Sequence, residues 1–412
     1  MKLYSHLLFV AFAAIILNSC KNGGAPQTAA NSAEFEKQLQ EKLINAKEGD
    51  VIELPEGNYT ITRPLILDGI KNVTIKGKGP EKTILNFKGQ KDGAEGLRIT
   101  ANGAILEDFA LLDAKGDCIK VQDGMNITFR RLKVGWTTLH STQNGSYGLY
   151  PVGCSNVLVE ECEVFGSSDA GVYVGQSKNI IVRRNRVHDN VAGIEIENCI
   201  DADVYENSSF NNTGGLLVFD NPDLPVKNGM RCRVHNNKIY DNNTNNFGPK
   251  GTSVSEIPAG TGFIVMATNQ CEIYSNEISN HNSISGSVIS YLTLKKPYKD
   301  TAEYDPYCGG ISIHDNNVRR GTGKVDQSVN FGQLLSALFG DKVPDLVYDG
   351  SINPKYKNND GSVKEDQKIC IRNNGNVSFV NLDMAHGNKN MTTDMSQMDC
   401  TVPAWQDVKI MQ

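Results

Sequence analysis

The chain has 412 residues, with 41 basic against 47 acidic side chains and a net charge of −6. This balance, together with the lack of any basic run with interleaved aromatic residues in the sequence, argues against a nucleic acid partner. The chain also contains 39 glycines, and short polar turns recur along it, which predicts a fold with many tight corners.

Residues 1–20 are predicted to be a targeting segment, with a basic start at Lys2, an apolar core at 7–17 and the processing site Leu-Asn-Ser-Cys at 17–20. The last tetrapeptide resembles the lipobox of bacterial lipoproteins. The resemblance implies that Cys20 is lipidated and anchors the protein in the membrane of the cell envelope, facing the periplasm or the cell exterior. A cleaved signal peptide is one alternative; a retained membrane helix is another, but the apolar core is short for a bilayer. A polar tether is expected at 21–32.

Helical spacing of apolar residues over 33–46 predicts an N-terminal helix that caps the first edge of the fold. Alternating runs at 51–67 and 71–87 then predict strand–turn–strand units. From residue 96 to 318 such strand–turn–strand units repeat. Along the first strand of each unit, every second side chain is expected to face the core. The remaining positions of these strands are expected to face solvent.

A recurring asparagine is the strongest pattern in these repeats, because it stands three positions after a β-branched residue in phrase after phrase. The positions are Asn185, Asn207, Asn237, Asn276, Asn316 and Asn374, with Leu132 and Cys162 in two earlier copies. A repeat lengthened in places by insertions is typical of a solenoid in which each coil packs on its neighbours. The pattern predicts an all-β parallel solenoid with side-chain amides stacked at the spacing of about 4.8 Å between strands.

The region after residue 320 departs from this period. Residues 295–308 and 321–368 are expected to be loops, with a short helix at 333–339, and 321–412 to be irregular coils that serve as a C-terminal cap or a lid. The solenoid itself is expected at 33–320, in a monomer. Most cysteines are predicted to be small core residues, whereas Cys308, Cys370 and Cys400 are expected to include one disulfide. No CxxC motif occurs, so no metal centre or cofactor is predicted from cysteine spacing.

The coils resemble the right-handed parallel β-helix repeats of pectinases, alginate lyases and epimerases, which implies a right-handed β-helix. The stretches 214–229, 242–247 and 260–269 more particularly resemble a family of exported bacterial β-helix proteins. Members are typically lipoproteins or signal-peptide proteins and are often encoded beside a second exported protein. No catalytic residue is assigned in that family, so the resemblance transfers none.

Two enzyme motifs are matched only in part. Residues 147–152, Tyr-Gly-Leu-Tyr-Pro-Val, are similar to the Tyr-Gly-Phe-Asp-Pro-His motif of mannuronan C5-epimerases, but Tyr150 and Val152 stand where that motif has its acid and imidazole. Residues 116–121 resemble a polygalacturonase strand that begins Asp-Asp, but Gly116 replaces one aspartate. Asp220 and Asp223 form a compact acidic group, interpreted as a structural turn or alternatively as a Ca²⁺ ligand loop.

Stacking the first strands places candidate site residues on the outward face of one sheet. Lys120, Tyr150, Tyr173 and Glu195 are the predicted catalytic residues, and Tyr147, Gln122, Glu197 and His140 the predicted substrate-binding residues. Lysine can neutralise a uronate, tyrosine can stack on a sugar or move a proton, and glutamate can accept hydroxyl hydrogen bonds. The alternative is that these polar and aromatic residues serve only the solubility and the cross-strand pairing of an exposed sheet. The four histidines at turn positions, His188, His235, His281 and His314, are explained by the repeat without a metal.

Further along, the same face becomes apolar at Leu217, Phe219, Ile264 and Met266. Either the insertions near 242–258 or 321–368 cover these residues, which is favoured, or a partner docks on them. Two functions therefore stay open. One is an exported lipoprotein that binds or processes a polysaccharide, with uronate-containing chains as candidate substrates. If it is an enzyme, the expected chemistry is that of an epimerase or a lyase. The other is a non-catalytic scaffold for another exported protein.

Overall fold

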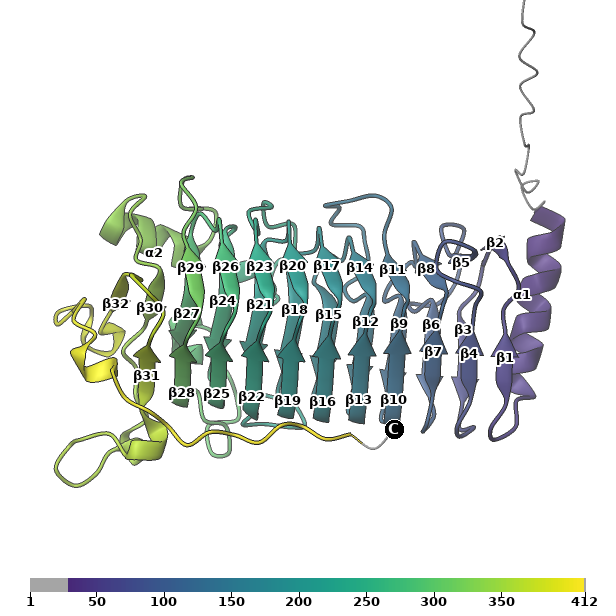
Figure 1. Ribbon diagram of the computed structural model, residues 1–412. Helices are drawn as coiled ribbons and strands as arrows, with labels where there is room; N and C mark the ends of the chain where they lie inside the picture. The colour runs from purple at the N-terminus through teal and green to yellow at the C-terminus, as the bar shows by residue number, and fades with distance from the viewer. Residues whose placement is uncertain (1–28, 411–412) are drawn as a thin grey trace, which may run out of the picture.

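Each coil of the chain except the last contributes one strand to each of three parallel sheets, as the computed structural model shows for the described residues, 29–410 (Figure 1). Within each sheet, neighbouring strands come from successive coils, so the chain winds around one axis. The predicted right-handed parallel β-helix is confirmed. The sheets have 11, 10 and 11 strands and are called A, B and C below.

Sheet A contains β1 (Val51–Glu53), β4 (Thr74–Lys76), β7 (Ile105–Glu107), β10 (Met125–Arg130), β13 (Ser155–Glu160), β16 (Lys178–Arg183), β19 (Ile200–Tyr205), β22 (Met230–His235), β25 (Asn269–Tyr274), β28 (Gly309–His314) and β31 (Ile369–Arg372). Sheet B contains β2 (Gly57–Thr60), β5 (Thr83–Asn86), β8 (Ala110–Leu112), β11 (Lys133–Gly135), β14 (Glu163–Phe165), β17 (Arg186–His188), β20 (Ser208–Phe210), β23 (Lys238–Tyr240), β26 (Glu277–Ser279) and β29 (Asn317–Arg319). Sheet C contains β3 (Leu65–Asp68), β6 (Leu97–Thr100), β9 (Ile119–Gln122), β12 (Leu149–Val152), β15 (Ala170–Gly175), β18 (Ala192–Glu197), β21 (Gly214–Phe219), β24 (Thr261–Met266), β27 (Ile284–Ile289), β30 (Leu346–Tyr348) and β32 (Phe379–Asn381). Short 3-10 helices are η1 (Val254–Glu256), η2 (Tyr291–Leu294), η3 (Pro354–Tyr356), η4 (Glu365–Gln367), η5 (Met384–His386) and η6 (Ser396–Met398).

The predicted asparagine ladder is present at the turn between sheets A and B. The Asn207 side-chain amide donates to Asn237 Oδ1 and to the Val182 carbonyl, each at 2.9 Å, and every ladder asparagine is buried. The ladder extends back to Cys162, whose backbone N–H donates to Asn185 Oδ1 at 2.9 Å. A buried turn leaves backbone groups without partners, and the stacked amides satisfy them coil after coil.

A second ladder, which the sequence analysis missed, lies five residues after Asn185, Asn207 and Asn237 and ends at His281. Asn190 donates to Asn212, Asn212 to Asn242, and the Asn242 amide lies 3.1 Å from His281 Nε2. His281 is fully buried, and burial lowers its pKa to about 3. The other turn histidines stack on aromatic neighbours: His188 between Phe165 and Phe210, and His235 between Tyr205 and Tyr274. The repeat register therefore stacks these histidines on the aromatic side chains of neighbouring coils.

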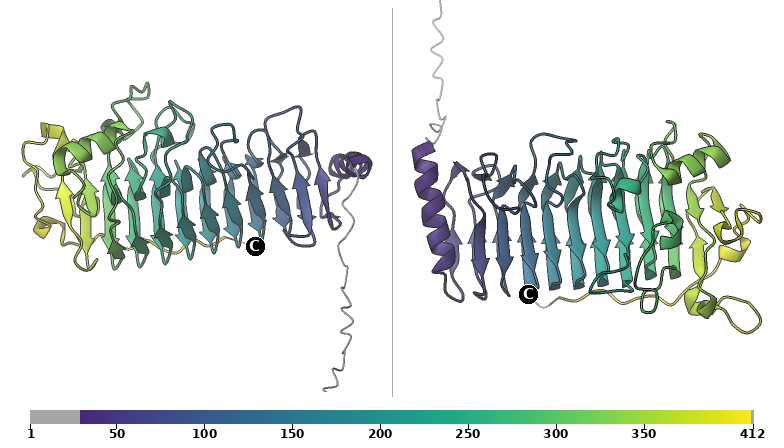
Figure 2. Two further views of the ribbon diagram at one scale, coloured as in Figure 1. Left: turned by 90° about the horizontal axis from the view of Figure 1, so that it is seen from above. Right: turned by 180° about the vertical axis from the view of Figure 1, so that it is seen from behind.

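Both ends of the solenoid are covered. The helix α1 (Ala29–Ile44) packs on β2 and β3 at the N-terminal edge, and it begins inside the stretch that was predicted to be a tether. At the other end, sheets A and C continue past residue 320 through β30, β31 and β32, and α2 (Asn330–Phe339) lies beside them (Figure 2). Among the described residues no helix has the length and hydrophobicity needed to cross a bilayer. The predicted targeting segment and Cys20 lie outside the described residues.

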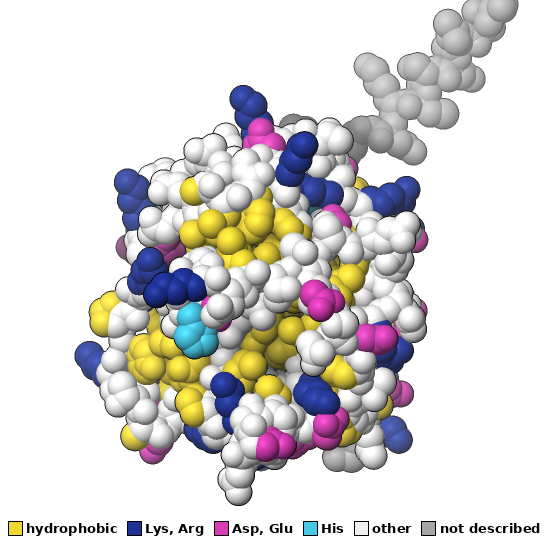
Figure 3. Space-filling model, turned by 90° about the vertical axis from the view of Figure 1, so that its left-hand side faces the viewer, with side chains coloured by type: hydrophobic (Ala, Val, Ile, Leu, Met, Phe, Trp, Pro, Cys, Tyr) yellow, Lys and Arg dark blue, Asp and Glu magenta, His cyan; other side chains and the backbone are white. Residues whose placement is uncertain are grey.

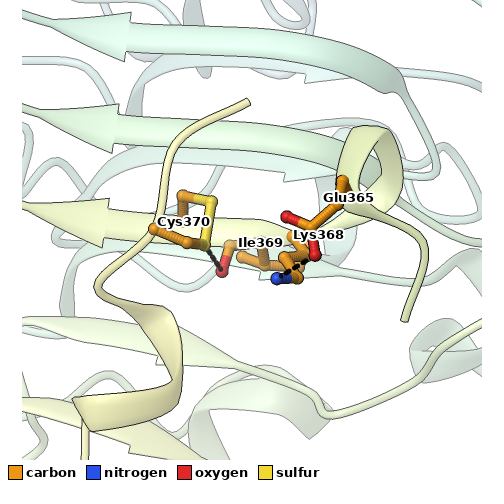
Figure 4. Close-up of a disulfide and its surroundings, with 5 residues drawn as sticks. Glu365, Lys368, Ile369 and Cys370 are labelled. Atoms are coloured by element: carbon orange, nitrogen blue, oxygen red, sulfur yellow. Dashed lines mark hydrogen bonds and ion pairs between the residues drawn. A yellow bond between two sulfur atoms is a disulfide. The ribbon is translucent and has the colours of Figure 1, made fainter. Parts of the chain in front are cut away.

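The C-terminal residues run back along the coils of sheet A (Figure 1). Asp407 forms an ion pair with Arg233, and the Val408 amide donates to Asp203 Oδ2 at 2.9 Å. Cys370 and Cys400 form a disulfide at the base of this segment, next to an ion pair of Lys368 with Glu365 (Figure 4). The prediction of one disulfide among the last three cysteines is confirmed, and Cys308 is a buried free thiol.

Candidate functional site

Three segments cover the second half of the outer face of sheet C. They are the insertion 241–260, which contains η1, the segment 291–304, and the amphipathic helix α2. Together with the sheet they form a second apolar cluster outside the solenoid, to which Phe247, Val254, Ile257, Phe331 and Leu335 contribute. Leu217, Phe219, Ile264 and Met266 lie beneath and are at most 3% exposed. The predicted internal cover is confirmed, so this apolar face offers no surface to a docking partner.

The first half of the same face stays open. Arg98, Lys120 and Tyr150 occupy one register position on three successive strands, β6, β9 and β12. The Lys120 ammonium lies 5.0 Å from the centroid of the Tyr150 ring and 3.9 Å from Glu95 Oε1. We call this surface the open strip, and its members are Glu95, Arg98, Asp117, Lys120, Gln122 and Tyr150.

Asp117 is a member that the sequence analysis did not select. Its Oδ1 accepts a hydrogen bond of 3.2 Å from the Tyr147 amide, at the turn that leads into β9. Burial raises the pKa of Asp117 to about 6, and the Lys120 charge opposes that rise. A carboxyl group that titrates near neutral pH is suited to proton transfer. The sequence signal that could have identified Asp117 was the partial polygalacturonase match, in which Asp117 is the aspartate that is retained.

Tyr173 and Glu195 are buried rather than open, which corrects the expectation that all outward positions of the sheet face solvent. They are 4% and 2% exposed. Tyr173 packs in the same apolar cluster as Phe247, Val254 and Ile257 of the insertion, so the covering segment excludes solvent from this part of the face. Strand alternation separates inward from outward side chains, but it does not show which outward ones another segment covers.

An acidic cluster lies at the border between the open and covered halves. It consists of Asp169, Glu195 and Glu197, each less than a tenth exposed. Glu197 accepts hydrogen bonds from the Tyr173 hydroxyl and the Asn221 amide, whereas Glu195 Oε2 has no partner. Burial raises the pKa of all three carboxyl groups, and repulsion from Asp169 and Glu197 adds to the rise for Glu195. Protons therefore bind more tightly to these carboxyl groups than to exposed ones.

Tyr147 joins the open strip to the acidic cluster. Its ring centroid lies 4.5 Å from that of Tyr150 and 4.4 Å from that of Tyr173. Burial raises the pKa of Tyr150 to about 12 and that of Tyr147 further. At neutral pH both phenols are protonated, so Tyr150 is suited to donate a proton and poorly suited to act as a base.

The remaining predicted site residues fall in different places. Gln122 belongs to the open strip, where its amide donates to Asp123 at 3.2 Å, and Glu197 belongs to the acidic cluster. His140 does not reach the strip: its Nε2 lies 3.0 Å from Asp189 Oδ1, and its ring lies beside Phe247 of the insertion. The structure thus brings Lys120, Gln122, Tyr150 and Tyr147 together.

The two proposed Ca²⁺ ligands lie in different surroundings. Asp220 is fully buried, while the exposed Asp223 accepts hydrogen bonds from the amides of Lys299 and Asp300 at 3.1 and 3.0 Å. Within residues 29–410, no group of three or more His, Cys, Asp or Glu side chains is arranged to hold a metal ion. Calcium at Asp220 and Asp223 stays an untested prediction, without support from this geometry.

The fold and the open strip define the chain as a β-helix protein with a polar and aromatic face on one sheet. Residues 83–328 match the family described as the right handed beta helix region, and the chain belongs to that family. No curated protein sequence matches significantly.

Solved structures of similar fold have low sequence identity to the chain. They include the A-module of a mannuronan C-5 epimerase from Azotobacter vinelandii, with TM-score 0.50 and 15% identity over 77% of this chain and 90% of that one. An alginate lyase from Paenibacillus sp. has TM-score 0.44 and 14% identity over 69% and 95%. An α-1,3-glucanase from Streptomyces thermodiastaticus has TM-score 0.45 and 18% identity over 79% and 48%. At 15% identity and a TM-score of 0.50, the likeness to the epimerase A-module shows the fold alone.

Proposed function

We propose that the protein is an exported, lipid-anchored protein that binds an acidic polysaccharide along the open strip and acts on it by proton transfer. The observation that carries the proposal is the placement of Asp117, Lys120 and Tyr150 together on adjacent coils of an uncovered sheet face. The anchor rests on the lipobox-like motif at Cys20. The A-module of similar fold is named as an epimerase of mannuronan, which is in keeping with a carbohydrate substrate.

Each residue of the open strip has a role in this chemistry. Arg98 and Lys120 neutralise a uronate carboxylate, which makes the neighbouring C5 proton more acidic. Tyr150 offers its ring to a sugar face and its hydroxyl as a proton donor. Asp117 takes the C5 proton, because its pKa of about 6 leaves it mostly ionised at neutral pH.

Two outcomes follow from the same carbanion-like state. If Tyr150 returns a proton to the opposite face of C5, the sugar is epimerised. If the C4–O bond breaks instead, the electron pair forms a C4–C5 double bond and Tyr150 protonates the leaving oxygen. The partial epimerase motif has no acid at 150 and no histidine at 152, so Asp117 from the preceding coil supplies the base in this proposal.

The test is a screen of the purified protein against alginate, polygalacturonate and a neutral glucan. Binding, the ultraviolet absorbance of unsaturated uronates and C5 configuration by NMR would all be followed. Lys120→Gln should weaken binding of the acidic polymers at least several-fold, whereas Lys178→Gln, an exposed lysine of sheet A, should not. Absence of both binding and product with every acidic polymer would reject the proposal.

A further inference from the structure

A separate pocket of about 410 Å³ lies at the C-terminal end of the solenoid. Three segments distant in sequence form it: η2 with Lys295, residues 350–357, and η5. Figure 3 views this end of the molecule and shows hydrophobic side chains gathered in hollows with basic side chains beside them. The volume lies in the range of small-molecule sites, which is about 300–1,000 Å³.

Asp349 fixes two walls of the pocket. It is fully buried, and its Oδ2 accepts hydrogen bonds from the Ser290 amide and hydroxyl, both at 2.7 Å, and from the Thr293 hydroxyl at 2.9 Å. Its Oδ1 accepts from the Ser351 amide at 2.8 Å. These four donors satisfy the hydrogen-bonding capacity of the Asp349 carboxylate. They also hold η2 and the segment 350–357 together.

Asp305 fixes the segment 350–357 from its other side in the same way. Its carboxylate accepts from the Asn353 amide at 2.8 and 2.9 Å and from the Tyr356 hydroxyl at 2.6 Å. These contacts hold the turn that carries Pro354 and Lys357. The pocket is therefore formed before any ligand binds, which lowers the ordering cost of binding.

The chemistry of the lining points to an anion. Lys355 pairs with Asp305, but Lys295 and Lys357, which line the pocket, have no carboxylate partner among the described residues. The nearby Asp383 is engaged by His386, whose Nδ1 lies 2.6 Å from Asp383 Oδ1. Apolar surface completes the lining, from Leu292, Ile352, Pro354 and Met384.

We propose that this pocket binds a small organic carboxylate, with the carboxylate between Lys295 and Lys357 and the ring or apolar body against Leu292 and Met384. The two lysine charges are complementary to the ligand carboxylate, and the apolar lining is complementary to the rest of the ligand. Two sources share this chemistry, namely a free aromatic acid and the uronate at the end of a glycan. The pocket does not depend on the open strip of sheet C.

The experiment measures binding of sodium benzoate and sodium glucuronate to the purified protein by ligand-observed NMR titration. Benzamide and glucose serve as neutral counterparts. At least one acid should bind saturably, with its neutral counterpart about tenfold weaker. The double variant Lys295→Gln/Lys357→Gln should weaken binding about tenfold. Lys389→Gln, which changes an exposed lysine just after η5, should leave it unchanged.

The outcomes separate clearly. Binding of benzoate alone identifies an aromatic acid site, and binding of glucuronate alone identifies a glycan-end site. Failure of both acids to bind, equal binding of the neutral counterparts, or unchanged affinity in the double variant would overturn the proposal. Loss of binding in Lys120→Gln would also overturn it, because the site would then be the open strip. Both lysines are exposed, so the variants are expected to fold, and circular dichroism checks this.

Discussion

The hydroxyl of Tyr173 on β15 donates a hydrogen bond to the carboxylate of Glu197 on the neighbouring strand β18, and both side chains are buried. This contact decides how the outer face of sheet C is divided. Tyr173 is committed to a buried partner and cannot serve as the base on an open surface. The open strip therefore carries the proposed chemistry, and the acidic cluster forms its closed border.

Tyr173→Phe is expected to change stability more than activity. The substitution removes a buried donor from Glu197 and should lower the free energy of unfolding by about 1–2 kcal/mol. Urea unfolding measures the change. Tyr240→Phe on β23 is the matched control, because its ring stacks on Phe210 and its hydroxyl has no hydrogen-bond partner among the described residues. A loss of polysaccharide activity with unchanged stability would show that Tyr173 acts directly.

Asp117→Asn is expected to abolish any C5 chemistry while keeping polysaccharide binding. In the native protein the rate should rise with pH through about 6, because the base is active only when ionised and burial raises its pKa to that value. Initial rates across the pH range test this. A rate that is independent of pH through this range would assign the base to another group.

Asp220 should make the folded protein less stable as the pH rises. Burial raises its pKa from 3.8 to about 8, so the folded state keeps this proton to higher pH than the unfolded chain does. The resulting stabilisation is complete below the unfolded pKa and is lost as the pH rises through the folded pKa. Asp220→Asn should therefore gain stability relative to the native protein as the pH is raised, in thermal melts at several pH values. The exposed Asp223→Asn should show no such gain, and equal behaviour of the two variants would contradict the assignment.

Asn207→Ala tests the ladder. The Asn207 side chain takes part in four hydrogen bonds: its Oδ1 accepts from both nitrogens of Asn185, and its amide donates to the Val182 carbonyl and to Asn237 Oδ1. Their loss in a buried turn should cost about 3 kcal/mol, since several groups lose partners at once. Asn211→Gly is the control: Asn211 is exposed and has φ of 55°, which glycine tolerates. Equal melting temperatures of the two variants would mean that the amides are not stacked as described.

Cys400→Ser is expected to loosen the C-terminal segment. The disulfide with Cys370 closes a loop with a sequence separation of 30, and cross-links of this size contribute roughly 3 kcal/mol. Limited proteolysis with mass spectrometry should show earlier cleavage between 376 and 410. Reductant should produce the same sensitivity in the native protein and no further change in the variant. An identical cleavage pattern before and after reduction would indicate that the disulfide is absent.

Much of the solenoid could be predicted from the residues that repeat. The spacing of Asn185, Asn207 and Asn237 determines one coil per repeat, because only stacked neighbours can satisfy a buried amide at every turn. The alternation in the first strands likewise determines which side chains enter the core. The companion ladder at Asn190 and Asn212 has the same spacing and was therefore equally predictable from the sequence.

Only the tertiary structure decided which of the outward residues are exposed to solvent and which are buried. Lys120, Tyr173 and Leu217 are all outward by alternation, yet the first lies in the open strip and the other two are buried. The difference arises from 241–260 and α2, which fold back over coils remote from them in sequence. Local periodicity reports the direction of a side chain relative to its own strand. Exposure depends on long-range packing, whose free energy comes from apolar area buried between distant segments, so no local pattern could show where the open strip ends.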